Sequence, residues 1–220
     1  MKKIFSALLC VFFSLAGMAQ ANKFTATLNP FSFAERDGGF TPGIGYNINS
    51  RLAIYADLGV IFFSAGQYSG DVIETNKSLG YKIKPAIRFY LKENKIQSGG
   101  FIELEGMYKR VTYHAVNEVD VLDNNGDIAY TYIGGYKVKK DVYGFNFKIG
   151  NRLFFDKEKK LGLDLYIGLG SRTKKFETSG LPVAARFDDD IFSDVNIFNF
   201  FWQSGRTISL PAGAKLFYNF

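Results

Sequence analysis

Apolar and polar residues alternate with a period of two along most of this chain, as in β-strands whose two faces meet different surroundings. Turn residues interrupt the alternation at intervals, so the pattern predicts eight strands. One phase of each strand is apolar and carries no charge in its central part, as at Leu163, Leu165 and Ile167. The predicted strands cover residues 23–34, 38–48, 51–65, 78–92, 99–115, 136–155, 161–176 and 206–220.

The opposite phase of these strands carries the charges. A soluble barrel or sandwich would bury the apolar phase, whereas a membrane barrel would turn it toward lipid, so the alternation alone leaves both structures open. Nine cations and four carboxylates share the charged phase. They are Asp57, Lys82, Lys84, Arg88, Glu103, Glu105, Lys109, Lys148, Arg152, Asp164, Arg172, Lys174 and Lys215.

The strand glycines favour the membrane barrel. Ten of them, including Gly45 and Gly162, fall on the charged phase, and Gly106 falls on the apolar one. Glycine on a water-exposed strand face packs nothing, but in a narrow lumen it leaves room for long side chains from the opposite wall. We therefore expect an all-β fold, namely an eight-stranded antiparallel up-and-down transmembrane β-barrel. A ten-stranded barrel, with residues 179–205 as an extra hairpin, is the alternative.

The connections between the predicted strands differ in length in the way that outer-membrane barrels require, with short periplasmic turns and longer outer loops. Asn125-Gly126, between two alternating runs, predicts a type I′ hairpin in which the fifth and sixth strands continue outward. Three connections are short and polar and are assigned to the periplasmic side: 47–50, 92–98 and 156–160. The other four are assigned to the outer side, and all but the first are long: 35–39, 66–77, 116–135 and 179–205.

The beginning of the chain has the order of a secretory signal peptide. Lys2 and Lys3 precede an apolar run, and small residues near 19–21 form a cleavage site, so we expect residues 1–21 to be removed. Cys10, the sole cysteine, leaves with them, which excludes disulfides and thiolate sites from the mature chain. Residues 22–220 contain no linker and no apolar run long enough for a spanning helix, and they are expected to form one domain.

The signal peptide, the eight alternating runs and the terminal Tyr218-Asn219-Phe220 resemble the small outer-membrane β-barrels, such as the OmpA transmembrane domain, OmpX and OmpW. The runs 28–33 and 18–20 are also similar to uncharacterised barrels of Bacteroidota. This resemblance implies export through the periplasm of a Gram-negative cell and integral insertion into the outer membrane, in contact with lipopolysaccharide. It also implies that the barrel assembly machinery recognises Tyr218 and Phe220.

An eight-stranded barrel encloses only enough space for its own side chains. Because buried charges are tolerated when they are paired, Glu103 and Glu105 are expected near Lys82, Lys84 or Arg88 on the adjacent strand. The predicted function is therefore structural or interactive, with a plugged polar lumen and outer loops that contact lipopolysaccharide or an external partner. A small pore or a hydrophobic-solute channel is the alternative, in which surplus positive charge would favour anions.

Other chemistry finds little support. Some eight-stranded outer-membrane barrels modify lipid A with a histidine and a serine two residues later. In this chain the sole histidine is His114, and Val116 occupies the place of the serine. No catalytic residue is therefore expected. Residues 123–127 resemble a calcium loop, yet Val121 and Tyr132 stand where oxygen ligands belong, so neither a metal nor another cofactor is predicted. The net charge of +6 falls by two with Lys2 and Lys3 and does not indicate nucleic acid.

The last outer connection is unusually apolar. Behind the acidic run 188–190, which could attract divalent cations, hydrophobic residues recur at helical spacing. Such a loop has to rest on the barrel rim, the lipid interface or a partner. The candidate partner-binding residues are Ile191, Phe192, Val195, Phe198 and Trp202.

Overall fold

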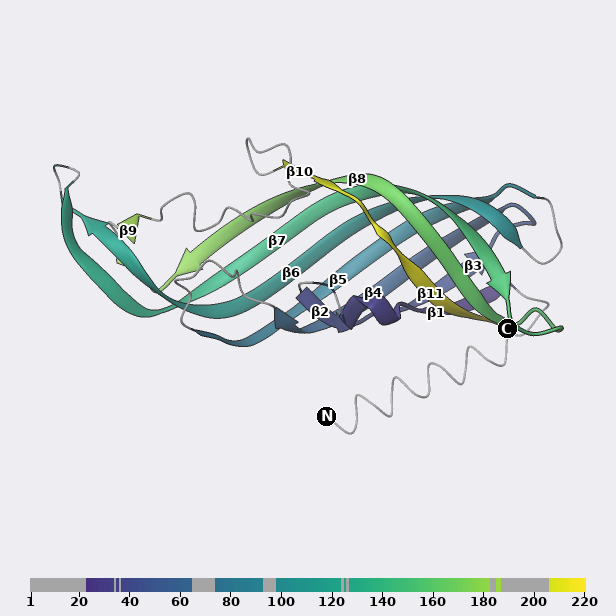
Figure 1. The fold of residues 1–220 in the computed structure, drawn as a ribbon, viewed down its shortest axis with the longest axis horizontal. Helices are drawn as coiled ribbons and strands as arrows, with labels where there is room; N and C mark the ends of the chain where they lie inside the picture. Colours follow the sequence, from purple (N-terminus) through teal and green to yellow (C-terminus); the bar gives the residue numbers. More distant parts are fainter. Residues whose placement is uncertain are drawn as a thin grey trace.

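The computed structural model shows an all-β protein in which one sheet curves round and closes on itself (Figure 1). It describes residues 23–33, 35, 37–64, 74–92, 98–123, 125, 127–182, 185–186 and 206–220. The wall contains β1 (Phe24–Leu28), β2 (Asp37–Phe40), β3 (Pro42–Asn47), β4 (Leu52–Ser64), β5 (Glu74–Tyr90), β6 (Gly99–Leu122), β7 (Ile128–Phe154), β8 (Leu161–Ser179), β10 (Arg206–Ser209) and β11 (Ala212–Asn219).

Every neighbouring pair in the wall is antiparallel. The pairing runs from β1 through β3, β4, β5, β6 and β7 to β8, and β11 closes the circle by pairing with both β8 and β1. β2 continues β3 beside β4, and β10 continues β11 beside β8, so the wall has eight strands. The predicted eight-stranded antiparallel barrel is confirmed. The ten-stranded alternative is wrong, because β9 (Ala185–Arg186) pairs with β6 beyond the wall.

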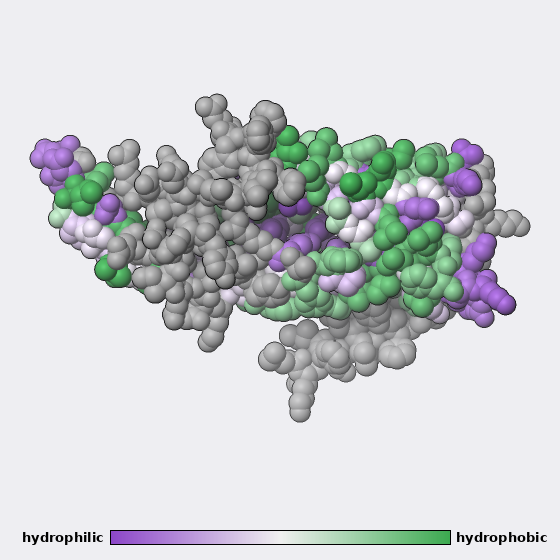
Figure 2. All heavy atoms as spheres, in the orientation of Figure 1, coloured by the Kyte–Doolittle hydropathy of each residue, from purple (hydrophilic) through white to green (hydrophobic). Residues whose placement is uncertain are grey.

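The two faces of the wall have the reverse of a soluble protein's polarity. On β7 the outward side chains of Phe145, Phe147 and Ile149 are about half exposed, whereas the inward Asn146 and Lys148 are buried. Figure 2 shows hydrophobic side chains over the barrel and hydrophilic ones at the end with the short turns. Soluble proteins bury charged residues rarely and only when these are paired, so this wall suits an apolar solvent.

The first predicted strand, 23–34, ends early at Leu28. Pro30 has no backbone N–H to donate, and the Asn29 side chain accepts the N–H of Phe31 at 3.1 Å, so residues Pro30–Phe33 form a 3₁₀ turn, η1. Ser32 Oγ donates to the Gly39 carbonyl at 2.5 Å and holds η1 against β2. Among the described strands, β2 pairs only with β4 and β10 only with β8, so each has one edge without a strand partner.

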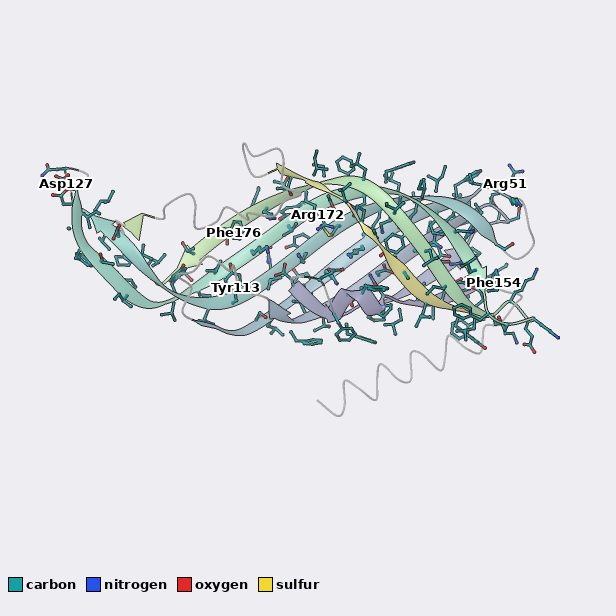
Figure 3. All side chains as sticks on the ribbon, viewed as in Figure 1. Arg51, Tyr113, Asp127, Phe154, Arg172 and Phe176 are labelled. Carbon is teal, nitrogen blue, oxygen red and sulfur yellow. The ribbon has the colours of Figure 1, made fainter. Side chains whose placement is uncertain are left out.

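β6 and β7 continue past the wall as a long hairpin, which we call the outer arm (residues 112–139 with β9). Its inward side carries a small core of Val119, Tyr136 and Val138, against which Tyr113 and Phe176 pack (Figure 3). The predicted outward continuation of these strands is present. This hydrophobic core stabilises the outer arm where it extends beyond the barrel.

The turn at the tip of the outer arm is not the predicted two-residue type I′ turn. The Asp123 N–H donates to the Asp127 carbonyl at 2.8 Å, which leaves three residues between them. The Asp123 carboxylate also accepts the N–H groups of Asn125 and Asp127, at 2.8 and 3.0 Å. This side chain supplies acceptors that a two-residue turn does not require, and it stabilises the wider turn.

Candidate functional site

Inside the barrel, glycines and large side chains face each other across neighbouring strands. A Cβ atom on Gly45 would lie 2.2 Å from the ring of its strand partner Tyr55, and one on Gly162 would lie 2.5 Å from the ring of Phe217. The glycines do make room for long side chains, but for those of the adjacent strand rather than the opposite wall. Gly43, Gly59, Gly150 and Gly168 stand in the same way beside Asp57, Lys82, Phe101 and Lys148.

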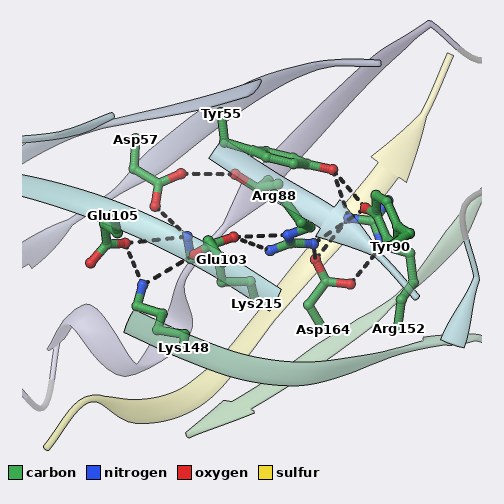
Figure 4. Close-up of polar contacts among 11 residues, drawn as sticks. Tyr55, Asp57, Arg88, Tyr90, Glu103, Glu105, Lys148, Arg152, Asp164 and Lys215 are labelled. Carbon is green, nitrogen blue, oxygen red and sulfur yellow. Dashed lines mark hydrogen bonds and ion pairs between the residues drawn. The ribbon is translucent and has the colours of Figure 1, made fainter. Parts of the chain in front are cut away.

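Two arginines share one carboxylate in the interior near the short-turn end of the barrel (Figure 4). Arg88 Nη1 on β5 and Arg152 Nε on β7 contact the two oxygens of Asp164 on β8, at 2.5 and 2.7 Å. Arg88 also binds Glu103 on β6 at 2.6 Å. All four side chains are at most 1% exposed, so the pairing removes four charges from water together. Such burial is tolerated only when hydrogen bonds satisfy the charges.

Aromatic rings cover the faces of the same guanidinium groups. The Arg88 guanidinium lies 3.8 Å from the ring centre of Phe101, and that of Arg152 lies 4.0 Å from the ring centre of Phe217. Arg152 Nη2 donates to the Tyr55 hydroxyl at 3.1 Å, which is 3.0 Å from the hydroxyl of Tyr90. Each arginine therefore has carboxylates in its plane and π-electrons above it, which offsets part of the desolvation of the cation.

Two lysines extend these contacts toward the middle of the barrel. Lys148 on β7 contacts Glu105 closely and Glu103 at 3.3 Å. Lys215 on β11 binds Asp57 on β4 at 2.5 Å and lies 3.9 Å from Glu105. The network thus joins six strands: β4, β5, β6, β7, β8 and β11.

We call this set the inner network. Its four cations meet four carboxylates, so its formal charge is zero, and each of its side chains is at most 3% exposed. The members are Asp57, Arg88, Glu103, Glu105, Lys148, Arg152, Asp164 and Lys215.

The interior nearer the outer arm has a different charge balance. Lys82 and Lys84 meet Glu35 at 2.9 and 3.5 Å, and Lys109 and Lys140 meet Asp37 at 2.5 and 3.2 Å. Arg172 on β8 also lies on the inward phase, and its buried Nε has no hydrogen-bond partner among the described residues (Figure 3). We call this set of seven the outer basic cluster: Glu35, Asp37, Lys82, Lys84, Lys109, Lys140 and Arg172. Its five cations exceed its two carboxylates by three.

All thirteen charged positions singled out in the sequence lie on the inward phase, eight of them in the inner network. Glu103 does contact Arg88, but Glu105 contacts Lys148 and Lys215 instead of the β5 lysines, which turn to Glu35. Lys174 follows Arg172 on β8.

Sequence reasoning missed Glu35 and Asp37, which it assigned to an outer connection, and also Lys140 and the inward tyrosines. An aromatic residue on a charged phase was the available signal for Tyr55 and Tyr90.

The other residues singled out lie apart from this interior. Tyr218 faces outward and its ring centre lies 5.0 Å from that of Phe220, whose N–H donates to the Phe24 carbonyl at 2.9 Å. His114 is exposed on β6. The signal segment 1–21 and the partner-loop residues Ile191, Phe192, Val195, Phe198 and Trp202 lie outside the described residues.

Neither a metal cluster nor a spanning helix occurs in the part of the chain that the structure describes. No three histidine, cysteine or acidic side chains there come together in a way that could hold a metal ion. None of its helices has the length and apolarity needed to cross a membrane.

No protein-family model and no curated protein matches this chain. Among solved structures, it is similar to a major outer membrane protein from Thermus thermophilus, with a TM-score of 0.40 and 10% identity over 90% of this chain and 98% of that one. A looser likeness, with a TM-score of 0.19 and 10% identity, is to the siderophore receptor PiuA from Acinetobacter baumannii, over 90% of this chain and 39% of the receptor. At these TM-scores neither likeness carries an argument about function.

Proposed function

We propose that this chain is an integral outer-membrane β-barrel of structural or interaction type, which holds the outer arm above the membrane on a closed, non-conducting barrel. The width of its apolar band supports the location. Outward residues of β7 from Tyr143 to Leu153, interrupted only by Asn151, run for ten residue steps. That is ~34 Å along the strand and ~26 Å along the membrane normal at a tilt of about 40°, close to the apolar height of about 25 Å in outer-membrane barrels.

The two ends of the barrel support an orientation. The connections 48–51 and 155–160, the adjoining ends of β5 and β6, and both ends of the described chain gather at one end, and the outer arm extends from the other (Figure 1). Outer-membrane barrels keep short turns in the periplasm and long segments outside. The outer arm would then face the exterior, where it can contact lipopolysaccharide or an external partner, while Tyr218 and Phe220 remain at the periplasmic end for the assembly machinery.

The inner network is the observation that carries the non-conducting part of the proposal. Its ion pairs link six strands across the lumen, and its side chains are almost completely buried. Eight strands enclose a space that side chains alone can fill. A network without net charge and without exposed members offers a passing ion neither a water-filled path nor an uncompensated counter-charge.

Conductance in planar bilayers tests this function. The folded barrel, checked by its altered gel mobility before and after boiling, is expected to insert without producing unitary currents. The double variant Arg88→Ser/Glu103→Ser removes a cation and a carboxylate together, leaves no net charge behind, and is expected to produce intermittent currents. Steady channels from the unaltered barrel would contradict the proposal.

A small anion pore is the second candidate function, because the outer basic cluster has a surplus of three positive charges. The same bilayers decide between the two. A pore of this kind would give currents whose reversal potential follows the chloride gradient, and Arg172→Gln would reduce that selectivity. Lipid modification is not part of the proposal, and His114→Ala is expected to leave lipid A composition unchanged.

A further inference from the structure

A row of tyrosines marks one height on the outward face of the barrel. The Tyr81 and Tyr108 ring centres are 5.9 Å apart, and those of Tyr108 and Tyr143 are 5.0 Å apart, so the row crosses β5, β6 and β7. Toward the short turns the outward residues are apolar, as at Ile83 and Phe145. Tyrosine girdles in membrane barrels lie where hydrocarbon gives way to head groups. The row therefore marks the outer boundary of the apolar band.

A pocket of about 600 Å³ lies on this outward face, immediately beyond the tyrosine row. Its volume falls in the range of sites for small ligands. Its floor is apolar and continuous with the apolar band through Leu79 and Tyr81. We call it the rim pocket; its lining side chains include Leu79, Tyr81, Arg110, Thr112, His114 and Lys137.

The polar groups of the rim pocket are donors without a carboxylate among them. The Asp141 carboxylate holds Arg110 from outside the pocket, with its Nε at 2.6 Å and its Nη2 at 2.9 Å. This contact fixes the guanidinium plane and leaves three of its five N–H bonds free. Lys137 is exposed and forms no ion pair with any described residue. His114, its strand partner, adds an imidazole N–H.

We propose that the rim pocket binds the phosphate group of a phosphorylated glycolipid of the outer leaflet, with Arg110 and Lys137 on the phosphate and Leu79 and Tyr81 against the start of its acyl chains. This inference deepens the proposed function and rests on its membrane location. Oriented guanidinium groups bind phosphate strongly. A free anion has no use for the apolar floor, whereas a lipid at the height of the tyrosine row presents its head group and its chains to the two parts of the pocket together.

The test is a binding titration of delipidated, folded barrel in detergent, with lipid A as the probe and bound lipid counted by native mass spectrometry. Lipid A is expected to bind, and Arg110→Gln/Lys137→Gln to weaken it by about tenfold or more, because two charge-assisted contacts are lost. The matched control, Lys92→Gln/Lys157→Gln, removes two exposed lysines from the short-turn end and should bind lipid A like the unaltered barrel. Equal binding by the pocket variant and the control would overturn the proposal.

A third variant separates phosphate binding from a structural role of the Arg110–Asp141 pair. Asp141→Asn removes the competing carboxylate and should strengthen lipid A binding several-fold if Arg110 binds phosphate. Weaker binding would show that the pair serves only to hold the strands, and would overturn the proposal.

Three further probes test the identity of the lipid. Lipid A without phosphates should bind at least about tenfold more weakly. Inorganic phosphate or phosphatidylglycerol that displaces lipid A at equal concentration would overturn the assignment to a glycolipid. The lipid A titration in detergent is independent of the conductance measurement in bilayers. A conducting barrel would refute the proposed function but would not affect a positive lipid A titration. A failed titration with a non-conducting barrel would refute only the assignment of the rim pocket.

Discussion

The two halves of the barrel interior hold their charges in different ways. In the inner network every cation meets a carboxylate that projects from a wall strand, and no member is more than 3% exposed. In the outer basic cluster Glu35 lies on the connection before β2 and its side chain is 35% exposed, whereas Asp37 is the first residue of β2 and is buried. The inner network thus pairs completely, whereas the outer basic cluster keeps three more cations than carboxylates among the described residues.

This difference predicts how much each half contributes to stability. Charges that are removed from water interact strongly but leave a large desolvation penalty when a partner is lost. Charges that keep contact with water are screened, and their pairs contribute about 1 kcal/mol or less. The inner network should therefore determine whether the barrel folds, and the pairs of Glu35, the one clearly exposed member of the outer basic cluster, should change its stability only slightly.

The largest effect is expected from Asp164→Ala. It leaves Arg88 and Arg152 buried without their shared carboxylate, so the free energy of unfolding should fall by about 3–5 kcal/mol. Urea unfolding of the barrel in lipid vesicles, followed by gel mobility, measures the change. Glu177→Gln breaks the exposed pair with Lys139 and serves as the control, with an effect of about 1 kcal/mol or less. Equal losses in the two variants would abolish the distinction between buried and exposed pairs.

The next effect concerns the space that surrounds the inner network. Gly45→Ala would place a methyl group 2.2 Å from the Tyr55 ring and should lower the free energy of unfolding by about 1–3 kcal/mol. Gly106→Ala is the matched control, since its nearest neighbour, Pro85, would be at an ordinary 3.5 Å. The same unfolding assay compares them. If both variants were equally stable, the large inward side chains would not depend on their glycine partners.

A smaller loss is expected from Tyr55→Phe, which deletes a hydroxyl that accepts a hydrogen bond from Arg152 of the inner network. Tyr90 and Arg152 would each lose a hydrogen bond in a buried place, at a cost of about 1–2 kcal/mol in unfolding free energy. Tyr46→Phe changes a tyrosine on the outward face and should have almost no effect. If Tyr55→Phe were as stable as Tyr46→Phe, the hydrogen bonds of the Tyr55 hydroxyl would contribute nothing to the stability of the barrel.

The smallest loss of unfolding free energy is expected from Glu35→Gln, and its dependence on salt concentration distinguishes the two halves of the interior. Glu35→Gln removes the carboxylate that Lys82 and Lys84 share, but the Gln amide oxygen can still accept their N–H groups and the Glu35 side chain is 35% exposed, so the loss should be about 1 kcal/mol or less at low ionic strength. It should shrink further in 1 M salt, where the Debye length is about 3 Å. The loss in Asp164→Ala should hardly change with salt. A salt-independent loss in Glu35→Gln would place the outer basic cluster in the same dry environment as the inner network.

The strands of the barrel wall could be predicted from the sequence because each strand turns one phase to lipid and the other inward. That period of two predicts the eight strands and the inward face of Arg88, Glu103 and Asp164 without knowledge of the strand pairing. The contact of Glu103 with Arg88 is one of the three that the sequence left open, with Lys82, Lys84 or Arg88, and the strand register selects it.

Features that depend on contacts between distant segments could not be obtained in this way. The early end of β1 follows from Asn29 and Pro30, but the return of Glu35 and Asp37 into the interior depends on lysines of β5, β6 and β7. Once Glu35 binds the β5 lysines, Glu105 is left to Lys148 and Lys215. Lys140 was obscured because it stands in a run of charges, Lys139 to Asp141, in which both phases are polar.

The central claim is that the apolar phase meets lipid while the charged phase around the inner network is shielded from both lipid and water. Spin labels on single cysteines at 143–151 of β7, in a Cys10→Ser background and in lipid vesicles, test it most directly. Odd positions should be relaxed by oxygen and not by a water-soluble nickel complex, and even positions by neither. Relaxation of the even positions by nickel, or of the odd ones by nickel instead of oxygen, would contradict the account.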